Sequence, residues 1–386
     1  MGLNREKGLD NLLKNEAPGS FFVPTQQIDY SVGVISTGAD TLDAALGGGW
    51  MRGHQHMVMG EYSAGKSSLI NCAIGRLLSF DPKALACIVD IEGSVTPQWL
   101  EKFDGIEFDY DNPRKNRVWV STPDTVENAA NSLCAIIREG IFDVIVVDSL
   151  GAVARGVEVD GKKGDGGDAN AMQVAGSAGV ITRMVNRVNA ELTRISNAKR
   201  AGADVVLPVI IYIGQARINL KSPHGGLIIS GGEGLKHMCK TITEIRASGK
   251  ADDIKWADIH GERVKIGTRI ITRNRKNKLA TPYREAGYMF YYTETPDHPF
   301  GVDSADSLVD LAVSYGVLKT SGSWMSYGTE GEKGFVKAQG KAKMVGLLRD
   351  NPEFAKAVHD DTMAVVIGES ESYLKTADAG AGEFKE

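Results

Sequence analysis

The strongest constraint on the fold of this chain is the segment GEYSAGKS, which runs from Gly60 to Ser67 and fits the pattern GxxxxGKS. It follows the apolar run QHMVM at 55–59 and opens a segment of helical periodicity at 65–78. Strand, glycine-rich loop and helix in this order are the context in which the pattern forms a phosphate-binding loop. We therefore expect the chain to fold around a unit that binds a nucleoside triphosphate.

The residue types of this loop suit phosphate binding. Its glycines let backbone N–H groups converge on phosphate oxygens, Lys66 supplies a positive charge, and the Ser67 hydroxyl can bind Mg²⁺. A chance Gly-Lys-Ser match is the alternative, which the flanking strand and helix disfavour. The predicted nucleotide-binding residues of the loop are Gly60, Glu61, Tyr62, Ser63, Ala64, Gly65, Lys66, Ser67 and Ser68.

Three further apolar runs predict the rest of a sheet, at 86–92, 144–148 and 209–213. Near-continuous apolar runs are typical of parallel strands that helices cover on both faces. Segments of helical periodicity lie between them, at 125–139 and 180–198. The sequence thus predicts an α/β core with a mostly parallel twisted sheet.

Acidic residues stand at the ends of two predicted strands. Asp148 ends a fully apolar strand, where a carboxylate is costly unless a cation lies beside it, and a Mg²⁺ shared with Ser67 would supply that cation. The alternative is an N-cap for the next helix. Asp90 and Glu92 are expected on one face of a neighbouring strand, and Glu92 is the candidate base that polarises an attacking water. A solvated strand end is the alternative for Glu92.

Changes of pattern along the chain predict four regions. Residues 5–15 form an amphipathic helix too short to be stable without a packing surface, which another subunit could provide. Two Gly-rich segments, at about 156–168 and 216–232, are expected to be loops at the carboxyl edge of the sheet, where ligands of α/β folds bind. The predicted regions are an N-terminal helix and linker at 1–33, the core at 34–299, a small domain at 300–367 and a flexible tail at 368–386.

Composition limits the remaining classes. No apolar run reaches the length of a membrane span, and the N-terminus lacks the features of a secretory signal, so we expect a cytoplasmic protein with no membrane partner. The net charge of −5 does not by itself indicate a nucleic-acid-binding protein, although phosphate contacts depend on local clusters of positive charge. The widely spaced cysteines are expected to be buried free thiols: Cys72, Cys87, Cys134 and Cys239.

A series of motifs resembles the RecA family of ATP-dependent recombinases over roughly residues 5–366. In chain order these are VISTGADTLDAALGGG, GEYSAGKSS, VDIEGSVTPQWL, DVIVVDSLGAV, IYIGQAR, SGGEGLKH, EIRASG, RNRKNKLATPYREAGYMFYY and SGSWMSYG. The resemblance implies a RecA-like P-loop NTPase core, an N-terminal polymerisation helix and a small α+β C-terminal domain for duplex DNA entry. It also implies ATP and Mg²⁺ as cofactors, and a helical filament on single-stranded DNA that pairs with double-stranded DNA and exchanges strands in recombination and repair. Single-strand binding and mediator proteins are further implied partners.

The resemblance assigns roles at the nucleotide. It places Glu92 at the catalytic glutamate, Gln215 at the glutamine that senses the γ-phosphate, and Trp99 and Tyr292 beside adenine. An ordinary core position is the alternative for Trp99 and Tyr292. Lys276 and Lys278, expected on one strand face, match lysines that reach the ATP of the neighbouring subunit, and a basic surface strand is the alternative.

The same resemblance assigns DNA contacts to the segments at about 156–168 and 216–232. The second of these contains Arg217 and Lys221, and its pair Gly231-Gly232 precedes a helix whose N–H groups can meet a phosphate. In the helix between the two segments, Arg183, Arg187 and Arg194 form a basic stripe, for which a solvated face is the alternative.

Some positions depart from the family pattern. Tyr62 stands where the family often has an acid, and Glu233 stands where an amide is usual, which puts DNA contact at that point in doubt. Such divergence is compatible with a bacteriophage member, in which case the compartment is the host cell cytoplasm. Two other functions stay open at this point: a hexameric DNA helicase of the same fold, and a regulatory P-loop ATPase or kinase that binds no DNA.

Overall fold

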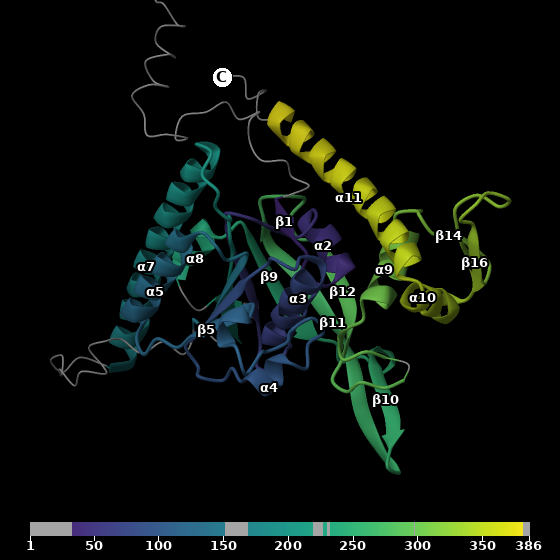
Figure 1. The fold of residues 1–386 in the computed structure, drawn as a ribbon, viewed down its shortest axis with the longest axis horizontal. Coiled ribbons are helices and arrows are strands. Elements are labelled where there is room, and N and C mark those ends of the chain that lie inside the picture. The colour runs from purple at the N-terminus through teal and green to yellow at the C-terminus, as the bar shows by residue number, and fades with distance from the viewer. Residues whose placement is uncertain (1–32, 151–168, 219–226, 230–231, 297, 381–386) are drawn as a thin grey trace, which may run out of the picture.

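The computed structural model describes residues 33–150, 169–218, 227–229, 232–296 and 298–380 (Figure 1). The N-terminal helix expected at 5–15 and the first Gly-rich segment at 156–168 lie outside these residues. Among the described helices, none is both long enough and apolar enough to cross a membrane.

A single 11-stranded sheet forms the centre of the described part of the chain. Six strands lie next to one another and run parallel, in the order β5 (Val118–Ser121), β4 (Ala86–Asp90), β6 (Val144–Asp148), β7 (Val209–Ile218), β3 (Gln55–Gly60) and β9 (Thr241–Ala247). The strands predicted at 55–59, 86–92, 144–148 and 209–213 are confirmed, and with them the α/β class with a mostly parallel sheet. The ends differ, since β4 stops at Asp90 and β7 runs on to Ile218.

Beyond β9 the sheet becomes antiparallel. The additional strands are β11 (Glu262–Asn277), β12 (Glu285–Tyr291), β13 (Gly301–Val302), β10 (Ile254–Ile259) on β11, and β8 (Leu227–Ile229) on β7. The hairpin of β10 and β11 projects from the body of the molecule (Figure 1). Its two-residue turn, His260-Gly261, has positive φ angles of 53° and 84°, as a type I′ turn requires. A separate two-stranded sheet pairs β1 (Val34–Ile35) with β2 (Trp50–Met51).

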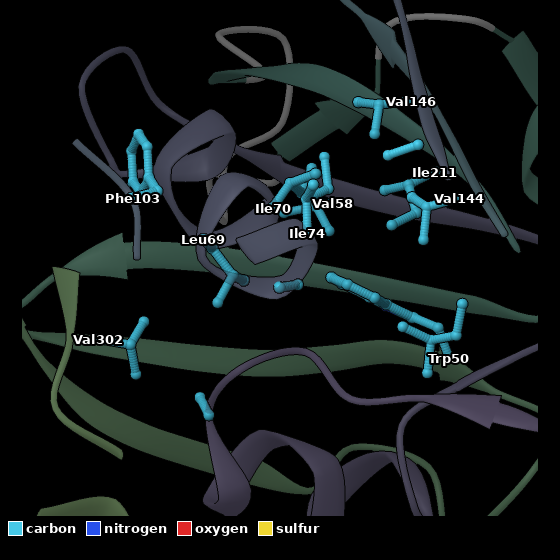
Figure 2. Packing of buried hydrophobic residues seen from close by; sticks show 14 of the residues in the cluster. Trp50, Val58, Leu69, Ile70, Ile74, Phe103, Val144, Val146, Ile211 and Val302 are labelled. Atoms are coloured by element: carbon cyan, nitrogen blue, oxygen red, sulfur yellow. The ribbon is translucent and has the colours of Figure 1, made fainter. Parts of the chain in front are cut away.

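Helices cover both faces of the sheet, with one apolar cluster on each side. On one face lie α2 (Asp40–Leu46), α3 (Lys66–Phe80) and the short α4 (Pro97–Leu100), and Figure 2 shows Ile70 and Ile74 of α3 beside Val58 and Ile211 of the sheet. On the other face lie α5 (Val126–Glu139), α7 (Ala169–Arg200) and α8 (Gly232–Met238). Four residues of the apolar stripe predicted on α7, namely Met184, Val188, Leu192 and Ile195, are buried against that face.

The C-terminal region has an apolar core of its own and also packs on α2, which lies against the central sheet. It consists of α9 (Ser304–Ser314), a three-stranded sheet of β14 (Lys319–Ser321), β15 (Trp324–Tyr327) and β16 (Val336–Gln339), then α10 (Lys341–Asp350) and α11 (Pro352–Gly380). The segment SWMSYG lies in an antiparallel hairpin of β14 and β15, with β16 as a third strand. Met363 and Val366 of α11 pack with Leu311 of α9 and Ala44 of α2.

Two expectations about loops are wrong in part. The segment at 216–232 was expected to be a loop, but residues 216–218 and 227–229 pair as the antiparallel strands β7 and β8, and residues 219–226 and 230–231 lie outside the described part. The β-branched, apolar composition of Leu227-Ile228-Ile229 favours a strand. The tail expected from 368 is helical as far as Gly380, where α11 ends.

Two helical glycines test the packing of the core. A Cβ added to Gly75 of α3 would lie 2.1 Å from the Asp104 carbonyl oxygen, whereas a Cβ on Gly346 of α10 would meet nothing within 4 Å. Gly75→Ala is therefore expected to lower the free energy of unfolding by about 1–3 kcal/mol through overpacking. Gly346→Ala, the matched control, should raise it by about 0.5–1 kcal/mol through helix propensity. Denaturant unfolding of both variants measures this, and equal effects would contradict the packing described here.

Candidate nucleotide site

The carboxyl ends of four parallel strands bring the candidate residues to one edge of the sheet. Gly60 ends β3 in register with Gln215 of β7, and Asp90 ends β4 in register with Asp148 of β6. The strand order β3–β7–β6–β4 therefore places the phosphate loop, the glutamine and the two aspartates side by side. Ligands of open α/β sheets bind at this edge.

The loop from Gly60 to Ser67 is shaped by two backbone requirements. A Cβ on Gly60 would lie 2.3 Å from the carbonyl oxygen of Ile245 in β9, so the close approach of two strands excludes any side chain there. Gly65 has a positive φ of 88° at the N-cap of α3. Lys66 donates from Nζ to the carbonyl oxygens of Gly60 at 3.1 Å and Glu61 at 2.6 Å, so its ammonium group lies within the curve of the loop. Burial lowers the pKa of Lys66, while Asp148 and Glu92 raise it.

Ser67 and Asp148 are joined directly. The Ser67 hydroxyl donates to Oδ2 of Asp148 at 2.8 Å, and Asp148 is only 7% exposed. Burial raises the pKa of Asp148 to about 6; the Ser67 hydrogen bond opposes this effect, and the carboxylates of Glu92 and Asp90 add to it. A carboxylate in this position is stabilised by a cation, which fits the Mg²⁺ predicted for this pair.

Protein side chains alone do not complete a metal site there. Within the described ranges, no three His, Cys, Asp or Glu residues are grouped so as to hold a metal ion. A Mg²⁺ held by Ser67 and Asp148 would take its other ligands from water and nucleotide phosphates, which is the usual mode of magnesium binding at nucleotide sites.

Asp90 and Glu92 have different surroundings, and the expectation that they share a strand face is wrong. Because β4 ends at Asp90, Glu92 belongs to the following bend. Asp90 is buried and accepts backbone hydrogen bonds from Gly93 and Val95, both at 2.9 Å, so it shapes the turn after the strand. Glu92 is exposed, and its Oε1 accepts a hydrogen bond from the Ser149 hydroxyl at 2.5 Å.

Gln215 connects Glu92 to the phosphate loop. Its Nε2 lies 3.4 Å from Oε1 of Glu92, and its Oε1 accepts a hydrogen bond from the Tyr62 hydroxyl at 2.9 Å. Sequence reasoning singled out all three residues but not the contact between Tyr62 and Gln215, which depends on the register of β3 and β7. Three residues beyond Gln215, β7 is still paired with β8, so the glutamine and this hairpin share one continuous strand.

A cavity of about 220 Å³ extends from the Ser67–Asp148 pair to Trp99, which lines it together with Asn71 and Val95. The Trp99 ring is 36% exposed and the Tyr292 side chain 42% exposed. Edge-to-face and tilted ring contacts link them in series through two phenylalanines, with centroid distances of 6.2 Å for Trp99–Phe300, 6.1 Å for Phe300–Phe290 and 5.7 Å for Phe290–Tyr292. The two predicted adenine-side residues therefore belong to one aromatic cluster.

Lys276 and Lys278 do not share a strand face. A bulge between Asn274 and Lys276 disturbs the ladder with β9, and β11 ends before Lys278. Lys276 donates from Nζ to the carbonyl oxygens of Lys236 at 2.5 Å and His237 at 3.0 Å, in the last turn of α8. The backbone N–H of Lys278 donates to the carbonyl oxygen of Lys240 at 3.1 Å.

Lys240 is thereby a third lysine of this cluster, and sequence reasoning missed it. Burial and then the charge of Lys278 lower the pKa of both Lys276 and Lys240. Lys240 precedes β9 by one residue and is 36 positions from Lys276, so its proximity follows from the pairing of β9 with β11. No signal in the sequence could have indicated it.

Part of the basic stripe on α7 contacts α5. Arg183 and Arg187 are exposed, and Arg187 donates to Oδ1 of Asn131 at 3.0 Å. Arg194 lies 4.0 Å from Glu191, which also pairs with Arg138 of α5. Among the other predicted DNA-binding residues, Arg217 lies in β7 and Gly232 begins α8, while Lys221 and Gly231 lie outside the described part.

Comparison with known proteins covers nearly the whole chain. A family model described as the RecA N-terminal domain matches residues 5–296, and one described as the RecA C-terminal domain matches residues 306–366. Protein RecA of Thermus thermophilus is 30% identical over 393 residues, covering 99% of this chain and 100% of that protein. Protein RecA of Thermus aquaticus is 30% identical over 380 residues, covering 95% and 98%. Protein RecA of Chlorobium chlorochromatii is 29% identical over 343 residues, covering 88% and 84%.

A parallel sheet with a GxxxxGKS loop between strand and helix defines the class of P-loop NTPases. Within that class, the chain belongs to the RecA family of recombinases.

The buried carboxylate provides a test of the site in the absence of ligand. The pKa of Asp148 is raised from 3.8 to about 6 in the folded state, so the folded state binds the proton more tightly than the unfolded state does. The free energy of unfolding contributed by this group therefore falls as pH rises from about 4 to 6, and the loss persists above that range. Asp148→Asn removes the loss and is expected to stabilise the nucleotide-free protein at pH 8 by about 1–3 kcal/mol, with little effect at pH 4. Thermal unfolding at both pH values measures this, and a shift independent of pH would contradict it.

Proposed function

We propose that this protein is an ATP-dependent recombinase that forms a helical filament on single-stranded DNA, pairs that strand with duplex DNA and exchanges strands. The observation that carries the proposal is the position of Gln215. Its amide contacts Glu92, and the strand that holds it continues directly into the β7–β8 hairpin. A residue proposed to respond to the nucleotide thus directly precedes a segment proposed to bind DNA, which gives ATP binding a direct route to DNA affinity.

The phosphate loop and Asp148 would bind Mg²⁺-ATP. Lys66 and the loop N–H groups bind phosphate oxygens, at the positive end of the α3 dipole. Ser67 and Asp148 hold the metal, which neutralises negative charge on the phosphates. Glu92 acts as the base that orients and polarises the attacking water, because it is an exposed carboxylate at the same edge of the sheet. The DNA-dependent ATPase activity rests on these residues.

The aromatic cluster would provide the adenine side of the site. Trp99 lines the cavity that reaches Ser67, and a flat apolar ring suits stacking on a base. Tyr292 stands at the other end of the same ring series, where Lys265 lies over its face at 5.6 Å. We assign Trp99 and Tyr292 to nucleotide binding on this basis.

DNA binding is proposed for the two Gly-rich segments and the surface near them. The assigned segments are about 156–168 and 216–232, and the assigned side chains or N–H groups are those of Arg183, Arg187, Arg217, Lys221, Gly231 and Gly232. Contacts of this kind would be to phosphates, so DNA binding should weaken steeply with salt. The ion pairs of Glu191 with Arg138 and Arg194 leave Arg183 and Arg187 as the stronger candidates on α7.

Filament formation requires contact between copies of the chain. We propose that Lys276 and Lys278 reach the ATP of the adjacent subunit, in the manner of an arginine finger in trans. The edge strand β5 supports self-association, since in the described sheet it pairs on one side with β4 and exposes Trp119 and Val120, each at 43%. We assign residues 1–33 to subunit packing and 300–367 to duplex DNA entry. Single-strand binding proteins, mediator proteins and a cytoplasmic location remain expectations from the family.

The separate roles of Lys66 and Glu92 can be tested with two variants. Lys66→Ala is expected to lose ATP binding, because it removes the charge that faces the phosphates. Glu92→Gln should bind ATP and single-stranded DNA but lower kcat by about 10²–10⁴-fold, because the amide cannot act as a base. Nucleotide binding and the ATPase rate with and without single-stranded DNA measure both. An ATPase rate in the unaltered protein that does not respond to DNA would overturn the recombinase proposal and favour a regulatory ATPase.

The trans arrangement predicts cooperativity between copies. Lys276→Ala and Lys278→Ala are expected to lower the DNA-stimulated ATPase rate at least about tenfold while leaving ATP affinity of the single subunit nearly unchanged, because they act on a neighbour's phosphates. Lys83→Ala, at an exposed position between α3 and β4, is the matched control and should behave like the unaltered protein. Full hydrolysis by a subunit that electron microscopy and sedimentation show to be isolated would contradict the arrangement.

A further inference from the structure

The ring of Tyr62 is exposed to solvent, so its packing contributes little to stability. It is 77% exposed at the crest of the phosphate loop, yet its hydroxyl donates to Oε1 of Gln215 at 2.9 Å. An exposed ring buries little apolar area, so its burial contributes little to stability. The hydroxyl is therefore the part of the Tyr62 side chain that makes a specific interaction here.

The backbone holds Tyr62 in position for this contact. Gly60 and Gln215 are register partners on β3 and β7, and Tyr62 follows Gly60 by two residues. The next residue, Ser63, has a positive φ of 57°, which turns the loop back toward α3. The Tyr62 ring therefore extends from the turn of the loop toward the end of β7.

The contact selects one orientation of the Gln215 amide. A glutamine amide has an acceptor on one side and two donor hydrogens on the other. The Glu92 carboxylate only accepts hydrogen bonds, so Nε2 faces its Oε1 at 3.4 Å, and the Tyr62 hydroxyl donates to Oε1 of the amide and holds it in this orientation. The flipped amide would place its oxygen beside a carboxylate oxygen, which is repulsive, and would leave the Tyr62 hydroxyl without this acceptor.

We propose that Tyr62 is a positioning residue of the nucleotide site: its hydroxyl fixes the Gln215 amide with the donor side toward Glu92, so that the glutamine can discriminate ATP from ADP. This inference rests on the proposed function, because it adds a residue to the nucleotide response. A donor group can bind an oxygen of a γ-phosphate, whereas a flipped acceptor would repel it. Tyr62 would thus take part in γ-phosphate sensing.

The test compares Tyr62→Phe, which removes the hydroxyl and keeps the ring, with Tyr327→Phe as the matched control. The Tyr327 hydroxyl donates to Asp361 at 2.7 Å in the C-terminal region. For each variant, titration calorimetry gives the affinities for ADP and for ATPγS, and steady-state assays with single-stranded DNA give kcat and KM. Both variants are also made in a Gln215→Ala background.

Tyr62→Phe is expected to reduce the preference for ATPγS over ADP, and kcat, by about fivefold each, the effect of losing one neutral hydrogen bond. KM for ATP should stay within about twofold of the unaltered protein, and Tyr327→Phe should change none of these values. In the Gln215→Ala background the effect of Tyr62→Phe should disappear, because the hydroxyl then has no amide to orient.

Three results would overturn the inference: no change in Tyr62→Phe, an effect that persists in Gln215→Ala, or a rise in KM without a change in nucleotide preference. The binding measurements separate this inference from the proposed function. If the unaltered protein binds both nucleotides but its ATPase rate ignores DNA, the recombinase proposal fails while the affinity ratios still decide the role of Tyr62. Failure to bind either nucleotide would overturn both.

Discussion

A buried carboxylate at the end of a central strand is the constraint on which the arrangement of this site depends. Asp148 is 7% exposed, and burial together with the nearby acids Glu92 and Asp90 disfavours its charge. Two groups favour the charged form of Asp148: the Ser67 hydroxyl, which donates a hydrogen bond to it, and the nearby ammonium group of Lys66. Both groups belong to the first turn of α3. The favourable contacts of Asp148 in β6 therefore depend on the position of the phosphate loop and of this helix. A cation bound beside this acid would offset the cost of its charge.

Strand β7 connects the candidate nucleotide site to the β7–β8 hairpin. It is buried in the middle of the parallel sheet over Val209–Ile213, where it cannot move without disturbing both apolar clusters. At Gln215 it reaches the nucleotide edge, and from Ala216 it pairs with β8. Gln215 therefore lies at the junction between the buried part of β7 and the part that pairs with β8. Lys276 bonds the last turn of α8, the helix that follows this hairpin, near the amino ends of β3 and β9.

The parts of this structure that the sequence predicted are those set by local pattern. Four parallel strands follow from apolar runs such as 144–148, the phosphate loop from the GxxxxGKS spacing, and the α7 stripe from residues such as Met184 and Val188. What escaped prediction depends on pairing across long separations. Lys240 meets Lys278 because β9 pairs with β11, and Tyr62 meets Gln215 because β3 pairs with β7. The position of Glu92 was also predicted wrongly. Strand β4 ends at Asp90, and the alternation of residues along a strand does not show where the strand ends.

These unpredicted contacts all lie around the ends of the parallel strands, and this has a physical reason. Many contacts fix the interior of the sheet, because the buried residues of β3, β6 and β7 pack into apolar clusters on both faces. Fewer packing contacts hold the side chains at the strand ends, so a single hydrogen bond from a hydroxyl or ammonium group can set the orientation of a side chain there. We expect substitution there to have little effect on the fold, because few packing contacts depend on it. The strand ends are thus the region where a chain about 30% identical to its relatives can keep the same architecture and still differ in its side-chain contacts.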